Sequence, residues 1–491
     1  MRKYKIYNSI LLLALFLVNV GCSDLLDESP DERLEVNSLD KVSATLIGAY
    51  QNDRGYRFTH FCTDNVTLTQ NVFDNHPIIE DLYSWSRNFR NQTHQDSPSA
   101  FWVASYGSIA NVNLALESLD KLTINSEMQA QADAIKGEAL IMRSYCHFML
   151  VNLFAKHYDQ TSASSDLGVP YVTEVEDELI VDYERGNVED VYNKAEKDLL
   201  EGIALLEKDS REVNKNKYRF TYPSVYLYAS RFYNYRNRDE ADVTQTLAYA
   251  NKAIEAFGGA DVMRAWSEYG SDNNGPIDID QQEVGFVQTS STWTSFNWTY
   301  QMTSDINSSE LSKNPFNKKD ERVSGGYKRS GNIFTPTGFF VYVPGYSEQT
   351  ASDIFPIAEA ILNVAEASIR LGDYVKAKEM LEIIGLHTYS MDADLDENPR
   401  GPYDPAALTT DKLKSFYGLE NDKQAWTEYL LFERRNMFLL RGFRWFDIKR
   451  YALDVEHLLE DGTTVKLSDV APDKDFQIPV FAIDAGMQAN Q

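Results

Sequence analysis

The chain has 491 residues, 43% of them apolar, so it can bury a large core and does not have the composition of a disordered polypeptide. Its 74 acidic and 47 basic residues give a formal net charge of −27. This acidity argues against nucleic acid and anionic lipid as electrostatic partners, because both are bound through clustered Lys and Arg. Aromatic residues make up 12% of the chain, and composition does not say whether they fill a core or face a ligand.

The first residues have the pattern of a secretory signal peptide. Three basic residues lie within residues 1–5, an apolar run extends over residues 10–18, and Gly21-Cys22 follows. The run is much shorter than the ~20 apolar residues of a membrane-spanning helix. Gly21-Cys22 is similar to a bacterial lipobox, although Asn19 stands where Leu is usual. We therefore expect removal of residues 1–21 and lipidation of Cys22; the alternative is a plain signal with a free cysteine.

Residues 22–36 are acidic, contain Pro30 and are expected to form a tether between lipid and domain. Beyond Cys22 only Cys62 and Cys146 remain, too few for a disulfide framework. Cys146 lies on an apolar helical face, which favours a buried thiol over a bridge to Cys62.

Apolar residues at spacings of three and four dominate the rest of the chain. They predict a helix of about 25 residues that includes residues 135–153, and a second helix over 243–257 that ends at Gly258-Gly259. The clearest unit spans residues 358–384, where two apolar-faced helices flank a turn at Leu371-Gly372-Asp373-Tyr374. This hairpin resembles a tetratricopeptide repeat. The polar stretch 234–242 is expected to interrupt a second, degenerate hairpin.

These patterns predict a mainly α fold, with a tetratricopeptide-like helical-repeat core, long irregular loops and a few short strands. Residues 37–491 are expected to form one domain. Two insertions without helical period, at about 60–100 and 265–350, are rich in polar and aromatic residues, and loops on a rigid scaffold are where binding residues usually lie. Short strands are expected at 283–289 and 338–343.

Several motifs occur along the whole chain in one order. They are Leu26-Asp27 after Cys22, the run 110–117 (ANVNLALE), Glu138-Ala139 with Arg143, Tyr145 and Phe148, Gly168-Val169-Pro170, the run 357–367 (IAEAILNVAEA), Glu433-Arg434-Arg435, the run 442–450 (GFRWFDIKR), and Ile478-Pro479. In this order they resemble the SusD/RagB family of Bacteroidota outer-membrane lipoproteins. Arg441 and the C-terminal residues depart from the family pattern.

The charged signature residues near the C-terminus are interpreted as structural. Arg444, Asp447 and Arg450 are spaced by three, which places them on one helical face as an ion-pair group. Trp445 and Phe446 are expected in the core. The run Glu433-Arg434-Arg435 is expected to form a charge network between packed helices.

No motif predicts catalysis or a cofactor. The seven histidines lack zinc-site spacing, and His147 is expected to be a hydrogen-bonded packing residue. Asp392, Asp394 and Asp396 alternate like the start of a calcium loop, but Glu397 occupies the position that needs Gly. A solvated acidic loop is favoured, with an irregular calcium site as the alternative.

Two aromatic clusters, at residues 83–89 and 293–300, fall in the insertions. They mix flat rings with Arg, Asn, Ser and Thr, a combination that can stack on sugar C–H faces and bind sugar hydroxyls or a peptide. In the family, ligand contacts tend to come from these two regions. The candidate ligand-binding residues are Trp85, Arg87, Asn88, Trp293, Phe296, Trp298 and Tyr300. Alternatively, these rings turn inward and pack.

The resemblance implies a lipid-anchored, surface-exposed protein of the outer membrane without catalytic activity. It would bind oligosaccharides or peptides and pass them to a SusC-like TonB-dependent transporter. The composition argues against a nucleic-acid partner. Two other classes remain open: a lipid-anchored glycan hydrolase, and a helical-repeat scaffold without a small ligand.

Overall fold

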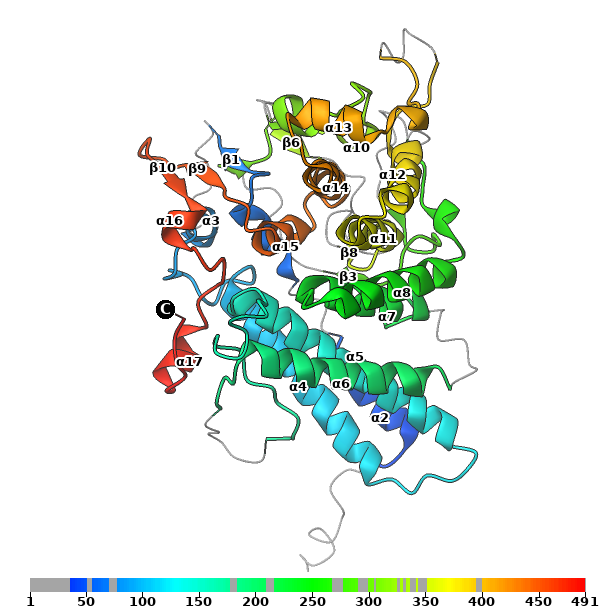
Figure 1. The fold of residues 1–491 in the computed structure, drawn as a ribbon. Helices are drawn as coiled ribbons and strands as arrows, with labels where there is room; N and C mark the ends of the chain where they lie inside the picture. The colour runs from blue at the N-terminus through cyan, green and yellow to red at the C-terminus, as the bar shows by residue number, and fades with distance from the viewer. Residues whose placement is uncertain are drawn as a thin grey trace, which may run out of the picture.

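Helices make up most of the computed structural model (Figure 1). The structure describes residues 36–50, 55–69, 77–176, 183–208, 216–266, 277–289, 299–303, 306–324, 327–329, 333–335, 341–342, 351–393 and 400–490. The leader, Cys22 and all of the expected tether except its last residue, Val36, lie outside these ranges. None of the described helices is both long and apolar enough to cross a bilayer.

The helices follow one another along most of the described chain. Their bounds are α2 (Leu39–Ile47), α3 (Pro77–Tyr83), α4 (Pro98–Asp120), α5 (Gln129–Phe154), α6 (Val188–Leu206), α7 (Tyr222–Arg236), α8 (Glu240–Phe257), α10 (Glu321–Ser324), α11 (Ile357–Leu371), α12 (Tyr374–Thr388), α13 (Thr410–Tyr417), α14 (Asp422–Met437), α15 (Phe443–Arg450), α16 (Leu467–Val470) and α17 (Val480–Asp484). In Figure 1, α2, α4, α5 and α6 form one layer, and α7, α8, α11, α12 and α14 lie above it. The predicted mainly α class is confirmed.

The hairpin of α11 and α12 follows the sequence pattern. Gly372 adopts the left-handed conformation (φ 79°) and ends α11, and the Asp373 side chain caps α12 by accepting a hydrogen bond from the Lys376 backbone N–H at 3.0 Å. The helix predicted over 243–257 is α8, and it ends at Gly258 as expected.

The prediction that residues 234–242 interrupt a hairpin is wrong. α7 extends to Arg236, Asn237 takes the left-handed conformation, and α8 begins at Glu240, so the two helices form a closed hairpin. Three polar residues of this stretch, Asn234, Arg236 and Asp242, are buried, and the Arg236 guanidinium contacts the Asp242 carboxylate at 2.6 Å. A buried ion pair and a polar surface loop consist of the same residue types. The sequence alone therefore does not distinguish them, and the predicted interruption of the hairpin was wrong for this reason.

The long helix predicted around residues 135–153 is α5, which packs against α4 and α6. His147 is fully buried on it, with Nδ1 2.9 Å from the Arg143 carbonyl and Nε2 accepting from the Val172 N–H at 3.0 Å. Burial lowers the pKa of His147 to about 3, so it is a neutral packing residue, as expected. The Cys146 and Cys62 thiols are both free and buried, and burial raises the pKa of each.

Strands are short and pair in twos. The pairs are β1 (Thr67–Leu68) with β4 (Tyr300–Gln301), β2 (Ile277–Asp278) with β7 (Val341–Tyr342), β3 (Val287–Thr289) with β8 (Ala351–Asp353), β5 (Tyr327–Arg329) with β6 (Ile333–Thr335), and β9 (Glu456–Leu458) with β10 (Thr464–Lys466). All pairs are antiparallel except β2–β7. The strand predicted at 283–289 is confined to β3, and β7 is the described part of the strand predicted at 338–343.

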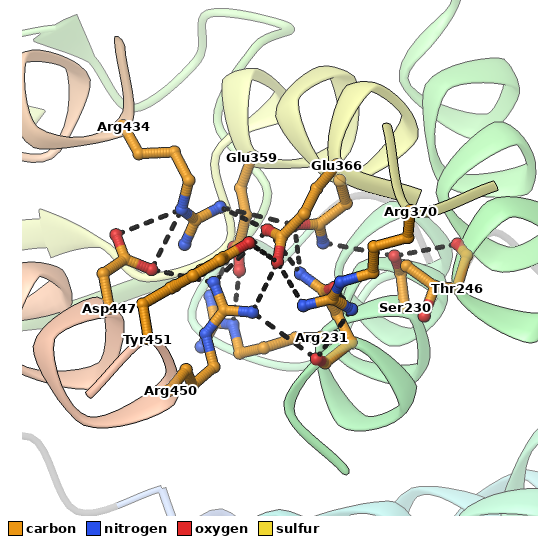
Figure 2. Close-up of polar contacts among 12 residues, drawn as sticks. Ser230, Arg231, Thr246, Glu359, Glu366, Arg370, Arg434, Asp447, Arg450 and Tyr451 are labelled. Carbon is orange, nitrogen blue, oxygen red and sulfur yellow. Dashed lines mark hydrogen bonds and ion pairs between the residues drawn. The ribbon is translucent and has the colours of Figure 1, made fainter. Parts of the chain in front are cut away.

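A buried charge network joins α7, α11, α14 and α15 (Figure 2). The Glu366 carboxylate of α11 accepts hydrogen bonds from Arg370 (2.5 Å), Arg450 (2.7 Å), the Tyr451 hydroxyl (2.6 Å) and the Asn234 amide (3.0 Å). Burial alone would raise the pKa of Glu366, but Arg450, Arg370 and Arg434 outweigh it and hold this pKa well below its usual range. Glu366 is therefore an anion in the folded protein.

Three further buried ion pairs join the same helices. Asp447 contacts Arg434 at 3.0 Å and Arg450 at 2.8 Å, and the Arg231 guanidinium pairs with Glu359 at 2.5 Å. The side chains of these residues are at most 3% exposed. Removing one member of such a set leaves a buried charge uncompensated, which costs several kcal/mol. The predicted ion pair of Asp447 and Arg450 and the predicted charge network at 433–435 are confirmed, and Trp445 and Phe446 are core residues.

Glu366→Gln is expected to lower the free energy of unfolding by about 3–5 kcal/mol, because a neutral amide leaves Arg370 and Arg450 without their shared counter-charge. Glu379→Gln is the matched control: it removes an exposed pair with Lys376 on α12 and should cost less than about 1 kcal/mol. Chemical denaturation measures both. Since the folded pKa of Glu366 is depressed, its contribution is present above the unfolded pKa of about 4.3 and is lost as pH falls. Equal losses for the two variants would contradict the assigned role.

Gly442, at the start of α15, lies where no side chain fits. Its φ is 82°, and a Cβ would lie 2.7 Å from the Tyr56 carbonyl oxygen and 2.8 Å from the Thr59 hydroxyl. The close approach lets α15 pack against the 3₁₀ helix η1 (Tyr56–Cys62) at the beginning of the first insertion.

Gly442→Ala should destabilise the protein more than Gly462→Ala. Both glycines have φ 82°, but a Cβ at Gly462 meets no atom within 4 Å. Gly462→Ala should therefore cost only the left-handed backbone penalty of about 1–2 kcal/mol, and Gly442→Ala that penalty plus the clash. Thermal unfolding of both variants measures the difference. Equal melting temperatures would show that the contact with Tyr56 is not constraining.

Candidate ligand site at the junction of the two insertions

The two predicted insertions meet through strands that lie more than 200 residues apart in the sequence. β1 of the first pairs with β4 of the second, with Leu68 opposite Tyr300, and the Thr69 N–H donates to the Thr299 carbonyl at 2.7 Å. The hairpin β9–β10 lies against β1 (Figure 1). Three distant segments of the chain therefore build one end of the molecule.

Four rings form a continuous stack at this junction. The His457 ring lies parallel to Tyr83 (centroids 4.0 Å apart) and to Trp85 (4.3 Å), and Tyr83 contacts Tyr300 at 4.4 Å. Each of these four residues is at most 5% exposed. The stack holds the first insertion, the second insertion and β9 together.

Hydrogen bonds fix the orientation of the rings. Trp85 Nε1 donates to the Cys62 carbonyl at 3.0 Å, and the Tyr83 hydroxyl donates to the Leu458 carbonyl at 3.1 Å. Both ring nitrogens of His457 face carbonyl oxygens, of Tyr83 (2.7 Å) and Thr63 (3.0 Å), so a neutral ring donates to only one of them. Burial lowers the pKa of His457 and the two carbonyls oppose this shift. Trp85 has φ 52°, a strained conformation for a non-glycine residue.

Of the two alternatives that the sequence left open, Trp85 and Tyr300 take the inward, packed one. The ring of Trp85 is covered by His457, and the ring of Tyr300 packs on Tyr83 and donates its hydroxyl to Glu460 at 3.3 Å. Flat aromatic rings next to polar residues are equally typical of a stacked core and of a sugar platform, and here the core arrangement holds both rings. Trp293, Phe296 and Trp298 lie outside the described residues.

The polar candidates lie at the surface beside the stack. The Arg87 side chain is 24% exposed and its Nη2 contacts Asp475 at 2.9 Å, while Nη1 has no hydrogen-bond partner among the described residues. Asn88 is exposed, and its backbone is held by Ser86 Oγ. Both side chains belong to the rim of the junction rather than to its core.

Residues of the C-terminal signature anchor the insertions, a role that sequence reasoning missed. The Arg444 guanidinium contacts Asp64 at 2.7 Å, and Arg435 bonds Asn65 at 2.7 Å and Glu310 at 2.8 Å. Burial alone would raise the pKa of Asp64, but Arg435 and Arg444 hold it well below its usual range. Arg444 thus pairs with a residue 380 positions away, and its expected grouping with Asp447 is wrong. In the sequence, only the polar Asp64-Asn65 dipeptide could have indicated that this insertion is anchored by arginines.

No metal centre is formed by the described residues: they contain no group of three or more His, Cys, Asp or Glu that could hold an ion. Asp392 of the expected acidic loop is exposed, whereas Asp394 and Asp396 lie outside the described ranges.

Comparison with known proteins agrees with this architecture. Residues 180–482 match the family model described as "SusD family", and residues 24–234 match one described as "Starch-binding associating with outer membrane". The chain belongs to the SusD family. No curated protein matches its sequence significantly.

Solved SusD structures share the fold. A SusD superfamily protein from Bacteroides thetaiotaomicron VPI-5482 superposes with a TM-score of 0.70 at 19% identity, over 92% of this chain and 100% of the other. A SusD superfamily protein from Bacteroides fragilis gives 0.63 at 18% identity, over 91% and 98%. A SusD-like carbohydrate binding protein from Bacteroides vulgatus ATCC 8482 gives 0.63 at 16% identity, over 88% and 89%. At these identities the likeness concerns the fold.

Trp85→Ala is expected to destabilise the protein by about 3–5 kcal/mol, because it empties the space between His457 and Cys62 in the buried stack. Asn88→Ala, three residues away and exposed, should change stability by no more than about 0.5 kcal/mol. Denaturant unfolding compares the two. If Trp85→Ala folds as stably as the native chain, the ring is available for another role and its assignment to the core is wrong.

Proposed function

We propose that this SusD family protein is a surface-exposed outer-membrane lipoprotein that captures oligosaccharides and delivers them to a SusC-like TonB-dependent transporter. The observation that carries the proposal is the junction: the two insertions expected to contact ligand converge through β1 and β4 on one end of the molecule. Family membership and the printed description of the matching N-terminal family model support it.

The junction has the construction expected of a binding site on a rigid base. The buried stack and the Asp64–Arg444 pair anchor the segments, and residues 293–298 of the second aromatic cluster immediately precede Thr299 and β4 in the sequence. Preorganised supports reduce the entropy lost when a flexible ligand binds. Sugar C–H faces would stack on Trp293 or Trp298, and Arg87 and Asn88 at the rim would bind hydroxyl groups. A peptide is the alternative ligand for the same surface.

The anchor is part of the proposal. The Gly21-Cys22 junction supports cleavage before Cys22 and acylation of its thiol, and two or more acyl chains hold a soluble domain stably at a membrane. Residues 23–36 would then give the domain reach above the bilayer. The transporter partnership is tested by co-purification of the protein with a barrel from the outer membrane of its host.

Trp293→Ala and Trp298→Ala are expected to weaken oligosaccharide binding, at least one of them by between about twofold and tenfold, without loss of thermal stability. Isothermal titration against a panel of neutral oligosaccharides measures the affinity. Phe416→Ala is the matched control, since Phe416 is 43% exposed on α13, outside both insertions. Affinity that is unchanged in both Trp variants would overturn the proposed site.

The same panel separates the competing functions. A hydrolase would release shorter sugars, and one Asp or Glu substitution would abolish the release. A scaffold would bind neither oligosaccharide nor peptide. Either result would contradict the proposed function as a protein that captures oligosaccharides.

A further inference from the structure

A groove of about 530 Å³ opens beside the charge network, outside both insertions. It lies between the first turn of α8, the last turn of α11, the first half of α14 and the end of α15. Its volume falls in the usual range of small-molecule sites. The groove is not used by the function proposed above.

The wall of the groove carries an excess of positive charge. Arg370, Arg450 and Lys423 line it, against Glu366 and Glu240. The two oxygens of Glu366 already accept hydrogen bonds from both arginines, from Tyr451 and from Asn234, so this carboxylate is fully occupied (Figure 2). Asp447 also pairs with Arg450 and with Arg434, so the network has two carboxylates, Glu366 and Asp447, for the three arginines Arg370, Arg434 and Arg450.

Two further observations concern the positive charge of this region. Arg450 is 3% exposed, and its Nε has no hydrogen-bond partner among the described residues. The pKa of buried His157 is lowered to about 3, first by burial and then by the positive charges of Lys449, Arg450 and Arg370. The potential near these guanidinium groups is positive, which favours an anion.

An exposed lysine lies at the open side of the groove. Lys423 is exposed on α14, and its Nζ donates to the Arg370 carbonyl at 3.2 Å, which places this ammonium over the end of α11. The first turn of α8 contributes Glu240 and Val243 to the wall, and the N-terminus of this helix is already capped by the Asp239 carboxylate. Asn237 and Thr427 line the groove as well and suit hydroxyl groups.

We propose that this groove is a binding site for a carboxylate-bearing sugar, with the carboxylate between Arg370 and Lys423 and the hydroxyl groups on the polar wall. The mixture of side chains favours this ligand over an apolar one: amide, hydroxyl and charged groups alternate with small apolar surfaces such as Val243 and Leu371. A uronate combines one negative charge with several hydroxyl groups and C–H faces, and so matches each part of the wall.

Titration of the full chain with D-glucuronate, D-glucose and acetate tests the site, with affinity followed by ligand-observed NMR or calorimetry. Glucuronate should bind, glucose should bind at least about tenfold more weakly, and acetate should bind more weakly than glucuronate because it lacks the ring. Added salt should weaken glucuronate binding. Equal affinity for glucose would overturn the role of the carboxylate, and equal affinity for acetate would overturn the role of the sugar.

Lys423→Glu should weaken glucuronate binding by about threefold to tenfold, because it replaces an attractive charge at the groove by a repulsive one. Lys412→Glu is the matched control, since Lys412 is an exposed lysine of α13 that does not line the groove. Both lysines are at the surface, so both variants should fold, and thermal melts check this. Equal affinity of the two variants would overturn the proposal. Because the probe is a uronate and Lys423 lies outside the insertions, this failure would leave the proposed capture of neutral oligosaccharides intact.

Discussion

The burial of Glu366 as an anion is the constraint on which the rest of the structure depends. A carboxylate without water must be surrounded by donors and opposite charge, and here these come from α7, α11, α14 and α15 through Asn234, Arg370, Arg434 and Arg450. Each of these helices can meet the requirement only in one relative position. The network therefore sets the register of the helical-repeat core more narrowly than apolar packing alone would.

The helices that close this network also carry the candidate site. α14 supplies Arg435, which pairs with Glu310 in the second insertion, and α15 supplies Arg444, which pairs with Asp64 in the first. The same two helices thus use one set of charges to fix the core and another to fix the loops. Loops anchored in this way can present ligand groups with little loss of entropy on binding, which is the physical advantage of placing a site on a rigid scaffold.

Local sequence patterns predicted the positions of the helices well and the burial of the polar residues poorly. The spacing of apolar residues by three and four identified α5, α8 and the α11–α12 hairpin. Such a stripe can be recognised in the sequence because it repeats every few residues along one helix. The polarity of residues 234–242 predicts an interrupted hairpin, whereas α7 and α8 form a closed one. Arg236 and Asp242 are buried because they satisfy each other, and a pattern based on polarity does not distinguish that from exposure.

By itself, the sequence determined the class of the fold, the family, and the two regions that meet at the candidate site. The tertiary structure decided what each ring and each charge contacts there. Trp85 and Tyr300 are buried because His457 and Tyr83 cover them, and Arg444 reaches Asp64 rather than Asp447. These partners lie up to 380 residues apart. Periodicity is a local property of the chain, whereas the partner of a ring or an ion is set by long-range packing, and so only the folded structure reveals it.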